Sequence, residues 1–217
     1  MSKEAPAEAR ALAFQAWLRG GGRGNGSRVR QTPQQELLAE HHLMAAVLEA
    51  MTEEARQMLR GDSLRPEFWA RVVDVIGNFT HHVHRAKEEQ CFFPALGEWG
   101  LLEPDDLRQL VQDHAALREM TLDLCEGVSE GDWEKAFRLV AIYVGRMRLH
   151  LEAEEERLLS ARLDEVPEER LAAVAERFAA IETRTLGAKG RAHYVEVARS
   201  LCRDVGLAGP LASLGDG

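Results

Sequence analysis

Residues 80–96, THHVHRAKEEQCFFPAL, place three histidines and two glutamates within ten positions and then become apolar. Side chains at positions i, i+3, i+4 and i+7 share one face of an α-helix. His84 and Glu88 therefore lie together, on the same stripe as the apolar Phe92, whereas His82 points away from them. Because this stripe includes apolar residues, the pattern predicts an inward-facing H-x-x-x-E pair.

A second H-x-x-x-E pair lies further along the chain. His150 and Glu154 share a stripe with Tyr143, Met147 and Leu158, which again predicts a position facing the interior. One such pair on its own is more typical of a surface i,i+4 contact than of a metal site. Two pairs on two buried stripes favour a metal site, because buried charge is costly unless it is paired or bound to metal.

Two single histidines complete the pattern. His41 lies among leucines of a helix expected at about 33–59, and His114 lies among apolar residues of a helix expected at about 104–127. In an antiparallel arrangement with a rise of ~1.5 Å per residue, both fall near the level of the two H-x-x-x-E pairs. We therefore expect four histidines and two glutamates to converge on one place.

The periodicity is helical after the first thirty or so residues, and no useful run alternates with the period of two that is typical of strands. Four long helices with short connections favour an all-α fold, an up-down-up-down four-helix bundle with two additional C-terminal helices packed outside it. The helices are expected over about residues 33–59, 66–94, 104–127, 132–163, 167–187 and 190–203.

The domain organisation follows from these helices. Residues 31–163 would form the bundle, and residues 164–217 a C-terminal helical extension that packs on it. Residues 1–30 would form a flexible arm and linker, since the segment GGGRGNGSR at 20–28 loses much backbone entropy on ordering. Ahead of these glycines, an amphipathic pattern allows a frayed terminal helix, which we favour, or a docking segment.

Composition limits the classes of function. The net charge of −9 argues against nucleic acid as a partner, because binding its backbone needs a basic surface. No stretch is long and apolar enough for a transmembrane helix, and no signal peptide is recognisable, so we expect no membrane partner. Three widely spaced cysteines without a CxxC pair favour a reducing, cytoplasmic location.

The converging side chains have the donor types of a dinuclear metal centre. Helix bundles build such centres from inward-facing glutamates and histidines. Two bridging glutamates and two histidines per ion would give each metal four protein ligands, and an oxo or hydroxo bridge would still leave one position open. Such a mixed ligand set suits iron, with manganese or zinc as alternatives. The predicted ligands are His41, His84, Glu88, His114, His150 and Glu154.

Other polar side chains near these positions receive different predictions. His81, on the inner stripe, is expected to support the ligands by a hydrogen bond. Tyr143 is a second candidate for such support, with plain core packing as the alternative. Lys87, Glu89 and Glu155 are expected to point to solvent, as partners of nearby charges. The remaining histidines, which we expect to be solvated or structural, are His42, His82 and His193.

The ordered set of motifs resembles the hemerythrin-like, or HHE cation-binding, family. The matching segments cover roughly residues 32–160 and read TPQQELLAEHHLM, FTHHVHRAKEEQCFFPAL, DHAALREM and LHLEAEEERLL. The resemblance implies a four-helix bundle with a non-haem di-iron centre held by the same six residues. Hemerythrins proper carry H-x-x-x-x-D on the last bundle helix and two histidines on the third, whereas this chain has His150-x-x-x-Glu154 and His114 alone.

This departure argues against reversible oxygen carriage, because both irons would have room for an exogenous ligand. The resemblance instead implies a protein that binds or reacts with O2, NO or peroxide, in oxidative or nitrosative stress or in iron handling. Two alternatives stay open: an iron- or oxygen-responsive sensor or binding module without catalysis, and a structural protein with zinc or no metal. The sequence identifies neither a protein partner nor an electron donor.

Overall fold

The computed structural model describes residues 31–207, apart from the side chains at 159 and 160. Residues 1–30 and 208–217 lie outside this part of the chain, so the predictions for the N-terminal arm and linker remain predictions. Every regular element within residues 31–207 is a helix, which confirms the all-α class. None of these helices is long and apolar enough to span a lipid bilayer.

Local capping signals define the long helices. Thr32 begins the first with a capping box, and Asp132 caps the last by accepting a hydrogen bond from a backbone N–H. Gly131, with a φ of 70°, ends the one between them in the left-handed conformation that glycine adopts without steric penalty. The three helices are α2 (Pro33–Leu59), α6 (Pro104–Glu130) and α7 (Trp133–Ser160).

The second expected helix is composite. Its segments η1 and η2 are π-helical, a geometry with i→i+5 hydrogen bonds that is rare and often found at functional sites. It also continues beyond its expected end near Pro94, because Pro94 lies in the first turn of a helical segment, where a missing N–H costs little. The segments are α3 (Pro66–Asp74), η1 (Val75–His84), α4 (Arg85–Lys87), η2 (Glu88–Phe92) and α5 (Phe93–Glu98).

Two helix ends differ from the prediction. α6 continues past Gly127, its expected end, to Glu130. Gly127 instead lies close to the start of α7, where an added Cβ would be 3.2 Å from the Ala136 backbone nitrogen. α7 ends at Ser160 rather than near 163, and the short 3-10 helix η3 (Leu163–Glu165) forms part of the connection that follows. The C-terminal helices agree closely with the prediction, as α8 (Glu168–Leu186) and α9 (Gly190–Asp204).

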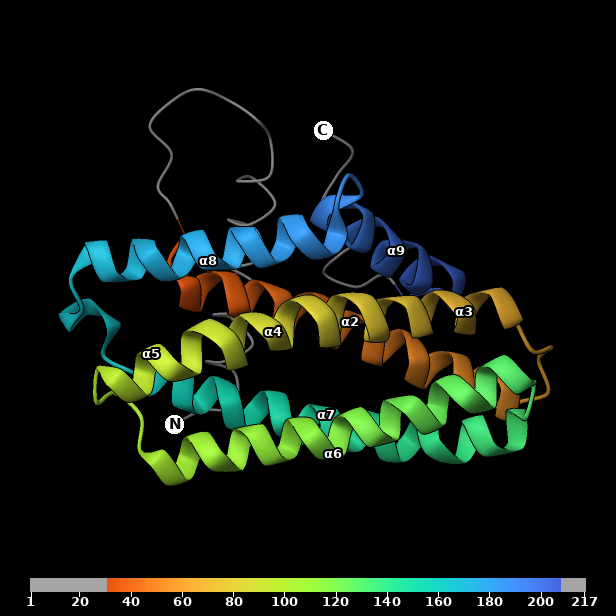
Figure 1. Ribbon diagram of the computed structural model, residues 1–217. Coiled ribbons are helices and arrows are strands. Elements are labelled where there is room, and N and C mark those ends of the chain that lie inside the picture. The colour runs from red at the N-terminus through yellow and green to blue at the C-terminus, as the bar shows by residue number, and fades with distance from the viewer. Residues whose placement is uncertain (1–30, 208–217) are drawn as a thin grey trace.

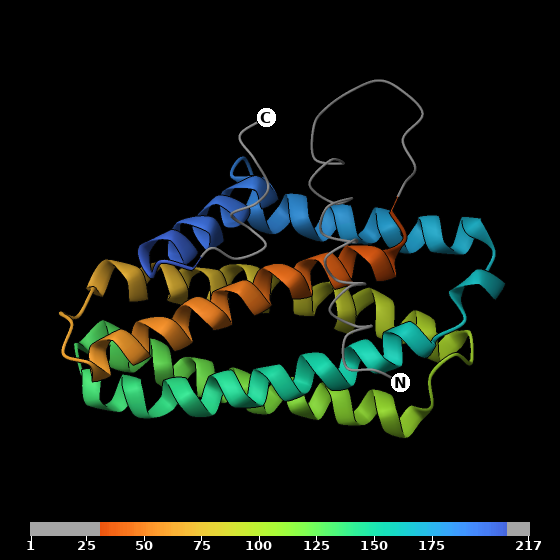
Figure 2. The ribbon, with the colours of Figure 1, turned by 180° about the vertical axis from the view of Figure 1, so that it is seen from behind.

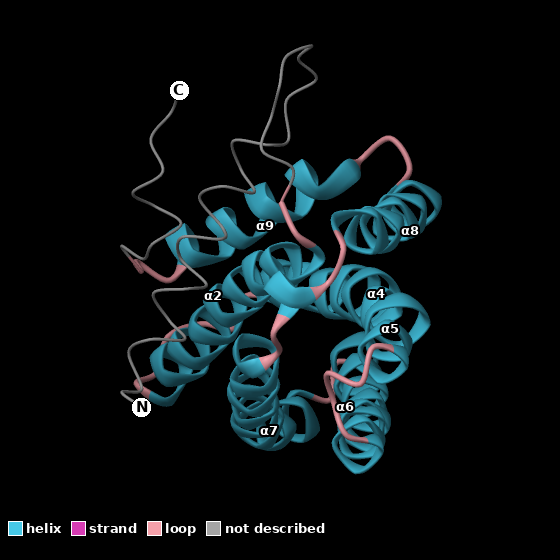
Figure 3. Cartoon of the chain, turned by 90° about the vertical axis from the view of Figure 1, so that its left-hand side faces the viewer, coloured by secondary structure: helices cyan, strands magenta, loops and turns pink. Residues whose placement is uncertain are grey.

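The helices lie side by side around a common axis. Seen from the end, α2, α4–α5, α6 and α7 surround this axis, and α8 and α9 lie outside α2 and α4 (Figure 3). α6 and α7 run in opposite directions against each other, and α2 lies next to α7 (Figures 1 and 2). α8 packs along η1, and α9 packs on α2 and α3. The C-terminal helices therefore cover a face that α2 and the composite helix share.

The apolar core of the described residues is divided into two clusters. The larger contains Leu43 and Trp69 and joins α2, α3, α7 and α9. The smaller contains Leu37 and Phe178 and joins the start of α2 to η2, α5 and α8. On α2, Leu37 belongs to the smaller cluster and Leu38, Ala39 and Leu43 to the larger, so the buried His41 is flanked along the helix by residues of the larger cluster.

Phe178 tests how firmly α8 packs on the rest of the protein. Its ring is fully buried and lies 6.3 Å from the ring of Phe92, centroid to centroid. Phe178→Ala should lower the free energy of unfolding by about 3–5 kcal/mol in urea denaturation, because it deletes a buried aromatic side chain. The control Ile142→Ala alters a side chain that is 60% exposed and should change stability by no more than about 0.5 kcal/mol. Equal effects of the two substitutions would contradict this packing.

Candidate metal centre

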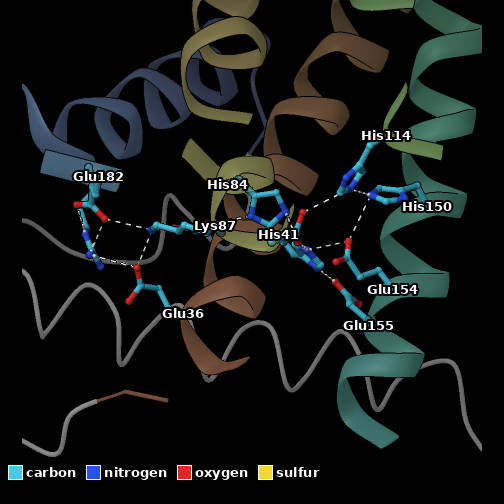
Figure 4. A network of polar contacts seen from close by, with 12 residues as sticks. Glu36, His41, His84, Lys87, His114, His150, Glu154, Glu155 and Glu182 are labelled. Atoms are coloured by element: carbon cyan, nitrogen blue, oxygen red, sulfur yellow. Dashed lines mark hydrogen bonds and ion pairs between the residues drawn. The ribbon is translucent and has the colours of Figure 1, made fainter. Parts of the chain in front are cut away.

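The six predicted ligands converge on one buried place between the helices (Figure 4). Glu88 contacts histidines from two different helices. Its Oε1 lies 3.0 Å from His84 Nε2, and its Oε2 lies 3.4 Å from His114 Nε2. The two oxygens of one carboxylate thus face imidazoles of η1 and of α6, as a carboxylate that bridges two metal ions would do.

Glu154 makes a corresponding connection from α7. Its Oε2 lies 3.3 Å from His150 Nε2 and 3.6 Å from His41 Nε2. The imidazole rings form two close pairs, with centroids 4.8 Å apart for His41 and His84 and 4.7 Å apart for His114 and His150. Each pair combines histidines of different helices, so the site exists only when the helices are packed.

Two groups of these side chains could each hold a metal ion, and the groups share Glu154. Within each group the candidate ligand atoms lie within 4.8 Å of one another. The first group comprises His41, His84, Glu88 and Glu154, and the second His114, His150 and Glu154. Two adjacent sites with a common carboxylate are the arrangement that a dinuclear centre requires.

Most atoms that would bind metal lack a hydrogen bond. Among the described residues, buried side-chain atoms without such a partner include Nε2 of His41 and His84 and both oxygens of Glu88 and Glu154. These atoms lie near one another, but not in hydrogen-bonding geometry. An unsatisfied buried polar group costs about 1–3 kcal/mol, and more if charged. Their concentration in one place fits a bound cation, which would satisfy all of them at once.

The two glutamates have different electrostatic surroundings. Burial, reinforced by the charge of Glu154, raises the pKa of Glu88 well above its ordinary range. Burial acts in the same direction on Glu154, but the contact with His150 outweighs it and lowers the pKa of Glu154. At His41, contacts with Glu155 and Glu88 outweigh burial and raise the pKa to about 9. The raised pKa values of Glu88 and His41 favour protons on these two groups, and a metal ion bound here would displace them.

Three carboxylates that were not predicted to belong to the site hold its histidines through Nδ1. Because a carboxylate only accepts, each of these Nδ1 atoms donates, which leaves Nε2 as the nitrogen that faces the site and can bind metal once it carries no proton. The pairs are His41 with Glu155 at 3.0 Å, His84 with Glu40 at 2.8 Å, and His114 with Glu89 at 2.9 Å.

The prediction that Glu155 points to solvent is wrong, since its side chain is fully buried. Glu89 is partly exposed and pairs with Arg85, as expected, but it also supports a histidine. A signal was present in the sequence: Glu89 and Glu155 each directly follow a predicted glutamate ligand, and Glu40 directly precedes His41. A residue next to an inward-facing one points along the flank of the helix, where a neighbouring helix covers it.

His81 lies beside the site, and both His81 and Tyr143 have partners other than the predicted ligands. His81 Nε2 lies 2.8 Å from Thr121 Oγ1, and Tyr143 packs in the larger apolar cluster. His81 belongs to π-helical η1, where the extra residue per turn shifts it off the stripe of His84. Of the histidines assigned elsewhere, His42 is buried, His82 is exposed and His193 is partly exposed on α9.

Lys87 is fully buried, which contradicts the expectation that it points to solvent. Its Nζ donates to Glu40, to Glu36 at 2.6 Å and to Glu182 of α8 at 3.2 Å (Figure 4). These carboxylates outweigh burial and raise the pKa of Lys87. Lys87 in turn, against the effect of burial, lowers the pKa of Glu40 to about 2. Glu40 therefore stays ionised and continues to accept from His84.

Comparisons with known proteins add no assignment to this geometry. No protein-family model matches the chain, and neither the curated proteins nor the solved structures gave a significant match. The resemblance to the hemerythrin-like family therefore rests on the motifs.

Glu155 provides a test of the histidine supports. Glu155→Gln removes the negative charge behind His41 and should weaken metal binding about 10–100-fold, because a neutral amide polarises the imidazole less. Competition with a chelator of known affinity measures the change. The adjacent Glu156 is exposed, so Glu156→Gln should bind metal as the unmodified protein does. The same loss in both variants would contradict the role of Glu155.

Lys87→Met leaves Glu40 buried without its cation. We expect the free energy of unfolding to fall by about 3–5 kcal/mol, the usual cost of removing one partner of a buried ion pair. Lys87→Met/Glu40→Gln should recover much of this loss, since the buried carboxylate of Glu40, which Lys87 contacts, is then replaced by a neutral amide. Urea denaturation of both variants measures the effect, and unchanged stability in Lys87→Met would show that the buried charges are not coupled.

Proposed function

We propose that the chain is a hemerythrin-like protein whose four long helical segments form an up-down-up-down bundle around a non-haem di-iron centre. The observation that carries the proposal is the convergence of unsatisfied ligand atoms in two groups that share Glu154. Imidazole and carboxylate donors suit iron, and manganese or zinc could use the same ligands. Bound iron would supply a redox-active Lewis acid for a small ligand.

The space beside the histidines supports a small ligand. A gap of about 10 Å³ lies next to His84, His114 and His150, and its other walls include Met44 and Met147. A volume of this size holds about one water-sized molecule. Small ligands such as O2, NO and peroxide are closest to this size, whereas an organic substrate is much larger.

The chain's own residues would keep this site ready for such a ligand. Glu40, Glu89 and Glu155 fix the orientation of three imidazoles, so that little rearrangement accompanies binding. We include in the proposal a cytoplasmic role in oxidative or nitrosative stress or in iron handling. The three free cysteines suit a reducing compartment.

A second function, that of an iron-responsive sensor or binding module, is favoured by the Lys87 network. His84 is connected through Glu40 and Lys87 to Glu182 of α8, and Glu182 pairs with Arg191 of α9 at 2.7 Å. Metal binding at His84 would thereby stabilise the C-terminal helices. Slower amide hydrogen exchange in α8 and α9 with metal would support the sensor, and identical exchange with and without metal would contradict it.

Metal analysis and absorption spectroscopy test the proposed function. The purified protein should contain about two iron ions per chain, as expected of a dinuclear carboxylate–histidine site. The spectrum of the reduced protein should change on mixing with O2, NO or peroxide. No change with any of the three would rule out the reaction, and an iron content below about one per chain would favour a structural role.

Matched variants test which residues hold the metal. Glu88→Ala and Glu154→Ala should each lower metal content sharply, because each removes a carboxylate that contacts histidines of both ring pairs. His82→Ala is the control, since His82 is exposed two positions from His84. Loss of metal in His82→Ala together with full retention in His84→Ala would refute the assignment of the inward face.

A further inference from the structure

A cavity of about 460 Å³ lies between η1–α4, α6 and the C-terminal part of α8. This volume is within the range of sites that bind small molecules. The charged groups on its walls are the guanidinium groups of Arg85, Arg118 and Arg184 and the carboxylate of Glu89. The whole chain has a net charge of −9, so the local excess of positive charge does not follow from composition.

Two of the three arginines are exposed, and their charge is not paired within the described part of the chain. Arg85 donates to Glu89 at 2.7 Å and to the carbonyl oxygen of His114 at 3.0 Å, and Glu89 is the only carboxylate that the described residues place on the cavity wall. Arg118 of α6 and Arg184 of α8 form no hydrogen bond or ion pair with any residue in the described part of the chain. A concave site lined by charge of one sign raises the local concentration of ions of the opposite sign.

His81 is also part of the cavity wall. Burial lowers the pKa of His81 to about 4, and the nearby Arg85 acts in the same direction, so His81 is neutral at pH 7. His81 Nε2 is held by Thr121, and its buried Nδ1 has no hydrogen-bond partner within the described residues. The cavity therefore combines cationic groups with a neutral imidazole.

We infer that this cavity binds a small oxyanion, held between Arg118 and Arg184. Guanidinium groups bind carboxylates and phosphates through paired, charge-assisted hydrogen bonds. The volume exceeds that of an inorganic ion, so the phosphate or carboxylate group of a small organic molecule fits as well.

The cavity also adjoins the candidate metal centre. His81 and Arg85 line both the cavity and the small gap beside His84, His114 and His150. An anion bound here would lie behind these two side chains, on the approach to the gap. The role of the cavity as a path to the metal centre rests on the proposed function, whereas the binding of the anion does not.

Cys125 is a reporter within the cavity. It is partly buried on the cavity wall, whereas the other two cysteines of the chain, Cys91 and Cys202, are buried elsewhere. Two thiosulfonate reagents of similar size, one anionic and one cationic, can label it, and Cys125→Ser verifies the labelled position. The ratio of their rates measures the local potential, because any change in the pKa of the thiol affects both reagents equally.

The anionic reagent should label Cys125 about tenfold faster than the cationic one. Arg118→Gln/Arg184→Gln should bring this ratio close to one. Millimolar inorganic phosphate should slow labelling of the unmodified protein but not of this variant. The control Arg56→Gln/Arg138→Gln removes the same charge from exposed positions on α2 and α7 and should leave the ratio unchanged.

Three results would overturn the inference: no preference for the anionic reagent, an equal loss of preference in the control variant, or no protection by phosphate. A phosphate monoester that protects at a lower concentration than phosphate would identify an organic anion as the better ligand. The measurement involves no metal, so its failure and the failure of the proposed function are distinguishable.

Discussion

The burial of two glutamates among four histidines is the constraint on which the rest of the described structure depends. Removing a carboxylate from water costs several kcal/mol unless cations or hydrogen bonds compensate it. Glu88 and Glu154 meet this cost together, since each contacts imidazoles from more than one helix. α2, the composite helix, α6 and α7 each contribute at least one of the six residues, so these helices must align at one level. The apolar residues packed around these side chains then keep water out of the site.

Buried charges are also paired further from the site, from the histidines to carboxylates and from a carboxylate to Lys87. Three histidines are held by carboxylates through Nδ1, and one of these carboxylates, Glu40, is held by the buried Lys87. Lys87 needs further negative charge, which Glu36 and Glu182 provide, and α8 excludes water from the pair. The C-terminal helices are thus part of the electrostatics of the site, because without them a lysine and a glutamate would face solvent.

The π-helical turns have a specific effect on the ligand stretch. The short α-helical segment α4 lies between His84 and Glu88, so their i,i+4 spacing keeps them on one face. In η1 the extra residue per turn moves His81 toward Thr121 and the arginine-lined cavity. The same stretch of chain consequently serves two neighbouring polar environments, one anionic and one cationic.

Local spacing was sufficient to predict the helical class, most helix boundaries and the six converging side chains. The pairs His84–Glu88 and His150–Glu154 could be found because residues four positions apart share a helix face wherever the helix lies. Lys87 and Glu155 were misplaced because a side chain on the flank of a helix meets either water or another helix, and only long-range packing decides which. The position of α8 over α4 buries Lys87, and the contact between α2 and α7 buries Glu155 against His41. Which side chains share a face of a helix depends only on the residues of that helix. Whether a side chain is buried depends on helices that are far apart in the chain.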